Sequence, residues 1–319
     1  MSRIDLRQFW SHAGGVNRSL LEWLLEKYPE TPKKRAKQWI TAGRVSVNGA
    51  ILRKPQQSMP DPGDALQLLD RQAKTLDCGP SGLPIHPRLI LLYLDASLAV
   101  VNKGPSLLSV PATNYELSAL TILADVVSGK LRTAHIIPAA YRQLQPLPVH
   151  RLDQYTSGVF CMAMNPVARQ FLIDQLIAHT MKRQYVAYVE GRLPAKTGTW
   201  RNRLKLSPDE LRQFVSTDAD AIEAITHYEV VRKYAHVTKL RLRLETGRRH
   251  QIRVQAAYVG VPLVGDRTYN PQGRIEFPRQ ALHAETLTLE HPDKPGQPMM
   301  WTAALPKDMQ HLEATLQRA

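Results

Sequence analysis

The stretch of sequence that limits the fold most is residues 240–260, where a strand pattern passes into a helix pattern. Apolar and charged residues alternate along LRLRLE, which is typical of a strand with one buried face. Gly247 then allows a sharp turn. The apolar residues of this strand are Leu240, Leu242 and Leu244. We therefore expect a sheet with one face covered by a helix.

The residues after the turn predict that covering helix. Ile252, Ala256 and Val259 recur at helical spacing and are expected to face the core, and Gly260 is expected to end the helix. Arg253 falls in the first turns, where packing would hold its side chain in place. The alternative interpretation is an ordinary arginine on the surface of a helix.

Composition excludes several classes of protein. Hydrophobic residues make up 43% of the 319, enough for a sizeable core. The longest apolar stretch, LILLYLDASLAVV, is too short and too interrupted to span a bilayer, and we expect no signal peptide at the start of the chain. Cys78 and Cys161 are far apart in the sequence, which indicates no disulfide framework and fits a reducing cytoplasm.

Net charge indicates the partner. Lys and Arg number 42 against 28 Asp and Glu, a formal charge of +14, which favours nucleic acid over a protein that is merely basic. The sequence has no GxGxxG, Walker, HExxH or GxSxG motif, and its histidines are scattered. We therefore expect neither a metal nor a cofactor.

Residues 1–75 predict a small RNA-binding domain. An amphipathic helix in RSLLEWLLEKY precedes a second helix that Thr31 caps, and Asn48-Gly49 predicts a type I′ hairpin turn. The pattern over residues 16–70 resembles the αL-type RNA-binding module of a ribosomal protein and of tyrosyl-tRNA synthetases. The cations expected to contact phosphates are Lys33, Lys34, Arg35, Lys37 and Arg44. The alternative is a helix whose charged face is only solvated.

The segment VHRLDQYTSGVF, residues 149–160, places one carboxylate beside an arginine and a histidine. This segment resembles the signature of the RluA-type pseudouridine synthases, which isomerise uridine in RNA. Three further stretches of the same family follow in order: KRQYVAYVEG, LETGRRHQIRVQAAYVGVPLVGDRTY and LHAETLTLEHP. Where the family usually has a Lys-Pro pair, this chain has Lys103-Gly104-Pro105.

The resemblance implies roles for individual residues. Asp153 is expected to act as nucleophile or base, Arg253 to keep that carboxylate ionised, and Tyr185 to stack on the target uracil, although a tyrosine in a strand is more often a core residue. Arg151 is expected to enter the gap left by a flipped-out base or to grip a phosphate. The other residues expected to bind substrate are His150, Thr156, Gly158, Arg248 and Ile252.

These observations combine into one hypothesis. We expect an α+β fold with a mixed, mostly antiparallel sheet in residues 88–319, joined to residues 1–75 by a linker over residues 76–87. The expected function is a monomeric, cytoplasmic isomerase that acts without a membrane, on large-subunit ribosomal RNA or alternatively on transfer RNA. A non-catalytic ribosome-assembly factor also stays open, as does a glycosidase-like hydrolase, which would normally need a second acid.

Overall fold

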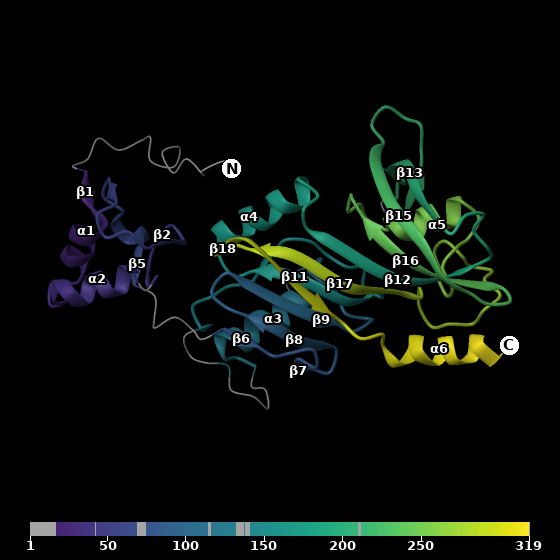
Figure 1. Ribbon diagram of the computed structural model, residues 1–319, viewed down its shortest axis with the longest axis horizontal. Helices are drawn as coiled ribbons and strands as arrows, with labels where there is room; N and C mark the ends of the chain where they lie inside the picture. The colour runs from purple at the N-terminus through teal and green to yellow at the C-terminus, as the bar shows by residue number, and fades with distance from the viewer. Residues whose placement is uncertain are drawn as a thin grey trace. The chain divides into compact units, whose positions relative to one another are not determined.

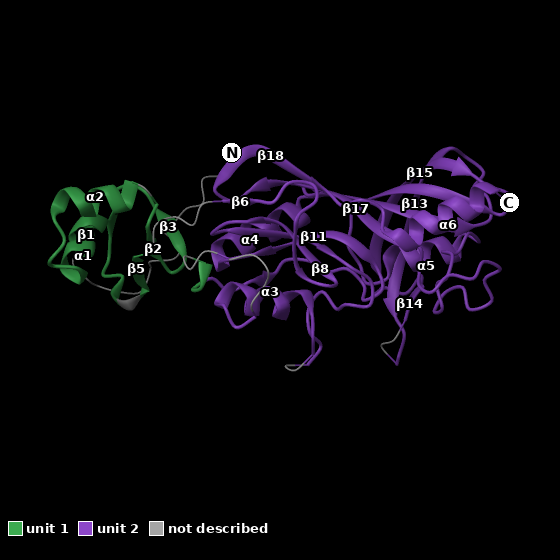
Figure 2. Ribbon diagram, turned by 90° about the horizontal axis from the view of Figure 1, so that it is seen from below, with its two compact units in different colours: residues 1–74, 138–143 green, residues 75–137, 144–319 purple. Residues whose placement is uncertain are grey.

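The computed structural model describes residues 17–41, 43–68, 75–113, 116–131, 137, 141–209 and 212–318. The chain divides into two compact units (Figure 2). The smaller unit comprises residues 1–74 and 138–143, and the larger unit comprises residues 75–137 and 144–319. That residues 1–75 fold independently stays a prediction.

The smaller unit contains two helices, α1 (Leu20–Lys27) and α2 (Lys33–Thr41), with short strands. Ser19 caps α1 reciprocally with Glu22, and a cluster of buried apolar residues joins the two helices to the strands. Asn48 and Gly49 both have positive φ, as the predicted type I′ turn requires. The strands are β1 (Arg18–Ser19) paired with β4 (Ser58–Met59), and a three-stranded sheet of β3 (Ala50–Leu52), β2 (Val45–Val47) and β5 (Leu66–Leu68), the last preceded by a 3-10 turn over Gly63–Ala65.

The larger unit is built on a thirteen-stranded sheet (Figure 1). Neighbouring strands are antiparallel except for β11 and β17, which are parallel, so the prediction of an α+β fold with a mixed, mostly antiparallel sheet is confirmed. Along its main path the sheet has the order β14 (Gln213–Val215), β13 (Thr197–Leu206), β15 (Ile222–Lys233), β16 (Val237–Leu244), β12 (Lys182–Glu190), β17 (Leu282–His291), β11 (Ser157–Ala163), β9 (Leu98–Lys103), β8 (Leu89–Leu94) and β6 (Leu76–Asp77).

Three further strands pair beside this path: β10 (Leu147–Pro148) with β11, β18 (Lys294–Thr302) with β17, and β7 (Leu83–His86) with β8. The segment 76–87 therefore differs from the linker that the sequence predicted. Its prolines and glycines do form turns, but Ile85 is buried, and β6 and β7 both hydrogen-bond to β8. Apolar residues between the turns were enough to add the segment to the sheet.

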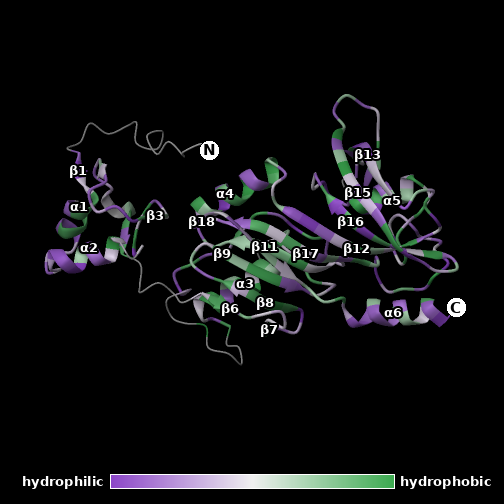
Figure 3. Ribbon diagram, in the orientation of Figure 1, coloured by the Kyte–Doolittle hydropathy of each residue, from purple (hydrophilic) through white to green (hydrophobic). Residues whose placement is uncertain are grey.

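Helices pack against this sheet at several places. Asn165 caps α4 (Pro166–Ile177), which packs on β10, β11 and β17, and α5 (Gln251–Tyr258) packs on β13 and β14. The other helices are α3 (Ala119–Ser128) and α6 (Lys307–Arg318). Hydrophobic residues gather along the neighbouring strands β8, β9 and β11 (Figure 3), which form one core cluster with α4 and part of β17.

The predicted helix after residue 247 is present, with one error at its end. Ile252 and Ala256 are buried as expected. Val259, which we expected in the core, is 42% exposed because α5 ends at Tyr258 and Gly260 turns the chain with a φ of 79°. The helix is therefore shorter than its apolar pattern, and its last apolar residue lies outside it.

Candidate active site

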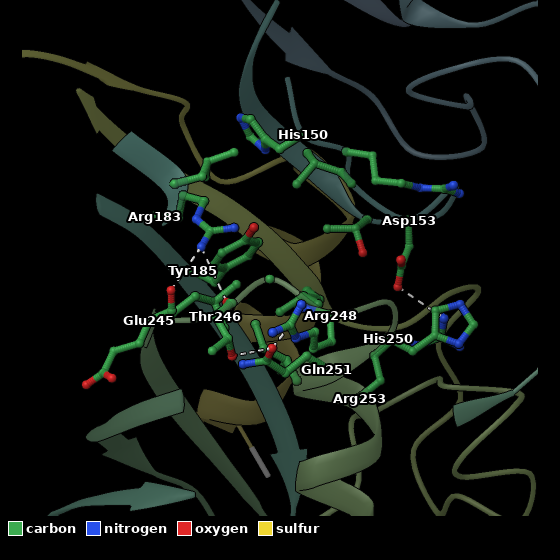
Figure 4. A pocket seen from close by; sticks show the side chains of 18 of the residues that line it. His150, Asp153, Arg183, Tyr185, Glu245, Thr246, Arg248, His250, Gln251 and Arg253 are labelled. Atoms are coloured by element: carbon green, nitrogen blue, oxygen red, sulfur yellow. Dashed lines mark hydrogen bonds and ion pairs between the residues drawn. The ribbon is translucent and has the colours of Figure 1, made fainter. Parts of the chain in front are cut away.

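A pocket of about 480 Å³ lies in the larger unit, where three segments of the sheet region meet (Figure 4). The loop of residues 149–153 and Thr156, between β10 and β11, forms one part of its wall. Arg183 and Tyr185 of β12 form another. The end of β16, the turn after it and the first residues of α5 complete the wall, with the end of α4 and Leu282 at the margin.

The loop that carries Asp153 is fastened through its backbone. The hydroxyl of Ser109 donates to the carbonyl of Leu152 at 2.8 Å and accepts from the N–H of Leu152 at 2.9 Å. Lys103 Nζ donates to the carbonyl of Gln154 at 2.9 Å. These bonds lie on both sides of Asp153, so the carboxylate, whose side chain is 20% exposed, is presented from a fixed backbone.

Arg253 joins Asp153 to a second carboxylate. Its Nη1 donates to Asp153 Oδ2 at 3.2 Å, while Nε and Nη2 donate to the two oxygens of Asp266 at 2.7 and 2.8 Å. Burial opposes the charge, but the hydrogen bonds and charge of Asp266, and then those of Asp153, raise the pKa of Arg253 above its ordinary value. The guanidinium therefore stays charged, as a positioning group that cannot act as an acid at ordinary pH.

Asp266 fixes Arg253 from behind. It is fully buried, and its Oδ1 also accepts the backbone N–H groups of Thr268 and Tyr269. A bidentate guanidinium–carboxylate pair has a defined plane. Arg253 thus has one orientation, and its remaining Nη1 reaches the carboxylate in the pocket. Two carboxylates and one guanidinium leave this group of three residues with a net charge of −1.

Tyr185 lines the same pocket from β12, with 6% of its surface exposed. Burial raises the pKa of its hydroxyl, Arg183 opposes that shift, and the charge of Asp153 adds to it. Tyr185 is therefore a neutral phenol at ordinary pH. The three residues to which the sequence assigned the chemistry, Asp153, Tyr185 and Arg253, all line one pocket although 100 residues separate the first from the last.

Residues of the Asp153 loop differ in their setting. Arg151 is exposed at the pocket and makes no side-chain hydrogen bond or ion pair with the described residues. His150 lines the pocket, but burial and the charge of Arg183 lower its pKa to about 3, so it is neutral at ordinary pH. Its Nε2 accepts the backbone N–H of Cys161 at 3.3 Å.

Thr156 and Gly158 lie next to this loop. Thr156 lines the pocket, although it is buried and its hydroxyl accepts from Gln280 at 3.3 Å. Gly158 does not line the pocket. Its φ is 120°, and a Cβ there would lie 2.1 Å from the carbonyl oxygen of Ala284, so this glycine is needed for the close approach of β11 to β17.

The turn before α5 and the first residues of α5 supply the other predicted substrate-binding residues. Arg248 and Ile252 both line the pocket, Arg248 exposed and Ile252 buried. His250 lies between them at a positive φ of 54° and contacts the hydroxyl of Tyr269 at 3.1 Å. Burial lowers the pKa of His250 to about 4, with Asp153 opposing the shift, so this histidine is neutral at ordinary pH.

The predicted RNA-contacting cations are in the smaller unit. Lys33, Lys34, Arg35 and Lys37 are exposed on α2. The guanidinium groups of Arg35 and Arg44 lie over the ring of Trp39, at 5.6 and 5.3 Å from its centroid. The predicted cations therefore lie on one short helix and the turn that follows it.

Sequence reasoning missed three charged residues at or behind the pocket. Asp266 stands in VGDRTY, at the end of a stretch that resembles the family, yet nothing local marks it as the partner of an arginine 13 residues away. Arg183 precedes Tyr185 by two residues on β12, and this spacing could have placed it on the same face. Lys103 is fully buried with its ammonium group on three backbone carbonyls.

Two other features bear on the chemistry. Within the described ranges, the side chains of His, Cys, Asp and Glu form no group of three or more that could hold a metal ion. No helix in the described part of the chain is both long and apolar enough to cross a bilayer.

Comparison with known proteins agrees with this geometry. The family model described as RNA pseudouridylate synthase matches residues 97–258, half of the chain. An uncharacterized RNA pseudouridine synthase of Bacillus subtilis, YlyB, is 32% identical over 90% of this chain and 90% of its own. Ribosomal large subunit pseudouridine synthase D of Yersinia pestis is 33% identical over 91% of this chain and 88% of its own.

Among solved structures, human RNA pseudouridylate synthase domain containing 4 matches with a TM-score of 0.57 at 20% identity, over 71% of this chain and 92% of that one. At this identity the likeness concerns the fold. The family model and the curated relatives go further, because they span the loop of Asp153, the strand of Tyr185 and the helix of Arg253. The chain belongs to the RNA pseudouridine synthase family, whose members are isomerases that convert uridine to pseudouridine in RNA.

Proposed function

We propose that this enzyme isomerises uridine in large-subunit ribosomal RNA, with Asp153 as the nucleophile or base. The reaction breaks the bond from C1′ to N1, rotates the ring and joins C5 to C1′, while C5 loses a proton and N1 gains one. Atoms and electrons balance without a co-reactant. The observation that carries the proposal is the Asp153–Arg253 contact of 3.2 Å in a pocket that Tyr185 also lines.

The environment of Asp153 supports this role. A carboxylate that attacks or accepts a proton must stay ionised in a partly desolvated pocket, which a neighbouring fixed cation favours. Arg253 supplies that cation, because Asp266 fixes it and raises its pKa. An ionised Asp153 is chemically suited to three alternative first steps: attack at C1′, attack on the ring, and removal of a sugar proton.

We also propose that the target nucleotide is flipped out of its stack. A uracil within paired RNA cannot reach a carboxylate inside a pocket. The ring of Tyr185 offers a face on which the extruded base can stack, worth about 1–3 kcal/mol per base. Arg151, exposed beside the pocket, is free to enter the gap or grip a phosphate.

The smaller unit is proposed to anchor the RNA as an αL-type module. Exposed cations on α2 neutralise phosphates without reading much sequence, which suits a large RNA with many phosphates. The choice of ribosomal RNA rests on this unit and on the names of the relatives. We propose further that the protein acts as a monomer in the cytoplasm. Size-exclusion chromatography with light scattering would contradict the monomer if it gave the mass of a dimer.

Tritium release from RNA labelled at C5 of uridine tests the proposal. The full chain is incubated with unmodified large-subunit ribosomal RNA, small-subunit ribosomal RNA and transfer RNA. Release from the first alone is the expected result, and Asp153→Asn is the control. Release from transfer RNA alone would change the substrate, and RNA binding without release from any of the three would favour a non-catalytic assembly factor.

A further inference from the structure

Arg183 is a buried arginine that faces the pocket from β12. It precedes Tyr185 by two residues, and alternate residues of a strand project from the same face of the sheet. Both line the pocket, and Arg183 is 8% exposed. In Figure 4 their side chains lie together on one side of the pocket, with Asp153 and Arg253 on the other.

Its hydrogen bonds use little of what a guanidinium offers. Nη2 donates to the carbonyls of Glu245 at 3.4 Å and Thr246 at 3.3 Å, both long contacts. Nε is buried and has no hydrogen-bond partner. A guanidinium carries five N–H donors, so most of the capacity of this group is unused.

Arg183 also has no anion beside it within the described residues. No carboxylate in that part of the chain lies within ion-pair distance of its guanidinium. The side chain of Glu245 points away and pairs with His227. Burial lowers the pKa of Arg183, although the charge of an arginine survives such a shift. A buried charge without a partner lowers the stability of the fold. An apolar side chain of similar size would fill the same space with a smaller loss of stability.

The turn beside Arg183 has room for its guanidinium. A Cβ at Gly247 would lie 2.5 Å from Arg183 Nη1, so a glycine there leaves the space that the charged group occupies. The neighbouring His150 is neutral. The described groups around the guanidinium thus leave its charge without an anion and its buried Nε without an acceptor.

We propose that Arg183 binds a phosphate group of the uridine nucleotide that occupies the pocket. This inference rests on the proposed function. A phosphate supplies the negative charge and the acceptor oxygens that the protein does not provide for Arg183. Guanidinium groups bind phosphates in a bidentate manner. A base stacked on Tyr185, with its sugar facing Asp153, brings the phosphates on that sugar into the same pocket.

Calorimetric titration of the full chain tests this inference without relying on turnover. The probes are uridine, uridine 5′-monophosphate and uridine 3′-monophosphate. Wild-type protein is expected to bind one monophosphate about tenfold more tightly than uridine, the scale of a hydrogen bond to a charged group. The monophosphate that binds more tightly than uridine shows whether Arg183 contacts the 5′ or the 3′ phosphate.

Three variants locate the effect. Arg183→Met should bind uridine and that monophosphate equally well, and Arg183→Lys should retain part of the preference, because a point charge lacks the fork of arginine. The matched control is Arg192→Met: Arg192 also donates from Nη2 to two consecutive carbonyls, at 3.4 and 3.3 Å, but it is exposed and lies outside the pocket. Its removal should leave the preference unchanged.

Several results would overturn the inference. The first is wild-type protein that binds neither monophosphate better than uridine. The second is a full preference in Arg183→Met. The third is an equal loss of affinity for all three probes in a folded Arg183→Met, checked by thermal melting, which would place the guanidinium on the uracil. If wild-type protein binds the nucleotides as expected but releases no tritium from RNA, the proposed function fails while this inference stands.

Discussion

Two buried arginines line the pocket from different elements, and their surroundings differ. On the α5 side, Arg253 has two carboxylates, Asp153 at 3.2 Å and the buried Asp266 at 2.7 and 2.8 Å. On the β12 side, Arg183 has two long bonds to carbonyls and an unused Nε. An arginine whose charge the protein already neutralises can fix a catalytic group but has little charge to offer RNA. An arginine that has no anion beside it, such as Arg183, has its charge available for RNA.

The largest expected effect comes from removing the carboxylate on the α5 side. Asp153→Asn keeps the size of the side chain but can neither attack nor accept a proton, so tritium release should fall by about 10³-fold or more. Affinity for RNA should stay within a few-fold, because Lys and Arg contacts to phosphates remain. Pseudouridine formation by the purified variant at a measurable rate would remove Asp153 from the chemistry.

The next effect concerns the fixed arginine itself. Arg253→Met leaves Asp153 and the buried Asp266 without their shared cation, so the single-turnover rate near neutral pH should fall by about 10²-fold or more. Arg253→Lys should be impaired less, since it keeps the charge but loses the bidentate geometry. Asp266→Asn is the informative comparison, because Asp266 is fully buried and does not line the pocket.

If Asp266 acts by orienting Arg253, Asp266→Asn should lower the rate of the chemical step while leaving the affinity for RNA nearly unchanged. Breaking a buried pair by removing one member also costs about 3–5 kcal/mol of stability. Rates should therefore be measured well below the melting temperature of the variant. A folded Asp266→Asn with wild-type single-turnover kinetics would mean that the buried pair only stabilises the fold.

The same comparison shows what the sequence could and could not predict. Asp153, Tyr185 and Arg253, which all line the pocket, could be proposed because each stands in a stretch that resembles the family, and the strand and helix that carry the last two were predicted from their patterns. The pairing of Asp266 with Arg253 and the absence of an anion beside Arg183 could not be predicted from the sequence, because both depend on which groups lie close together in the folded chain. The neutral state of His150 could not be predicted for the same reason, because burial beside Arg183 causes it.

Fold errors had a similar origin. The segment 76–87 has the composition of a linker, but pairing with β8 makes it part of the sheet. Val259 continued an apolar helical pattern beyond the point where Gly260 turns the chain. In both cases a local signal was correct about turns or periodicity, and the tertiary contacts decided where the element began or ended.

A smaller effect is expected from cations outside the pocket. Replacing Lys33, Lys34 and Lys37 with Gln leaves the buried face of α2 intact, since all three are exposed. If each neutralises one phosphate, the slope of log affinity against log salt should become shallower by about 2–3, because each contact contributes about 0.7–0.9. The catalytic rate at saturating RNA should not change.

The matched control for this change replaces three exposed lysines of the larger unit, Lys196, Lys294 and Lys307, with Gln. It alters the net charge equally. Filter binding of ribosomal RNA from low to moderate salt provides the measurement. Equal slopes for the two triple variants would mean that overall charge, and not an RNA-binding face on α2, attracts the RNA.

The smallest effect tests how a buried cation without a carboxylate behaves when it can lose its charge. Lys103 is fully buried and donates to the carbonyls of Gly104, Leu107 and Gln154. Burial lowers its pKa to about 7, with Asp153 opposing and Arg279 adding to the shift. A buried lysine can therefore lose its charge by deprotonation in the folded state, which removes the destabilising effect of the buried charge. Arg183 keeps its charge, so the destabilising effect remains until an anion binds.

The direction of the pH dependence follows from proton binding. Below about pH 7 Lys103 is protonated both folded and unfolded, so the cost of its buried charge is fully present. Between that pH and its ordinary value of 10.5, the unfolded chain binds the extra proton, and stability rises with pH by up to about 1.4 kcal/mol per unit. Lys103→Met lacks this contribution.

Urea unfolding of both proteins at pH 6, 7, 8 and 9 should therefore show a stability difference that is constant up to about pH 7 and then grows in favour of wild type. A difference that stays constant through pH 9 would mean that Lys103 keeps its charge in the folded state. A buried cation without a neighbouring carboxylate would then serve a purely structural role, and the absence of a carboxylate beside Arg183 would no longer indicate a ligand.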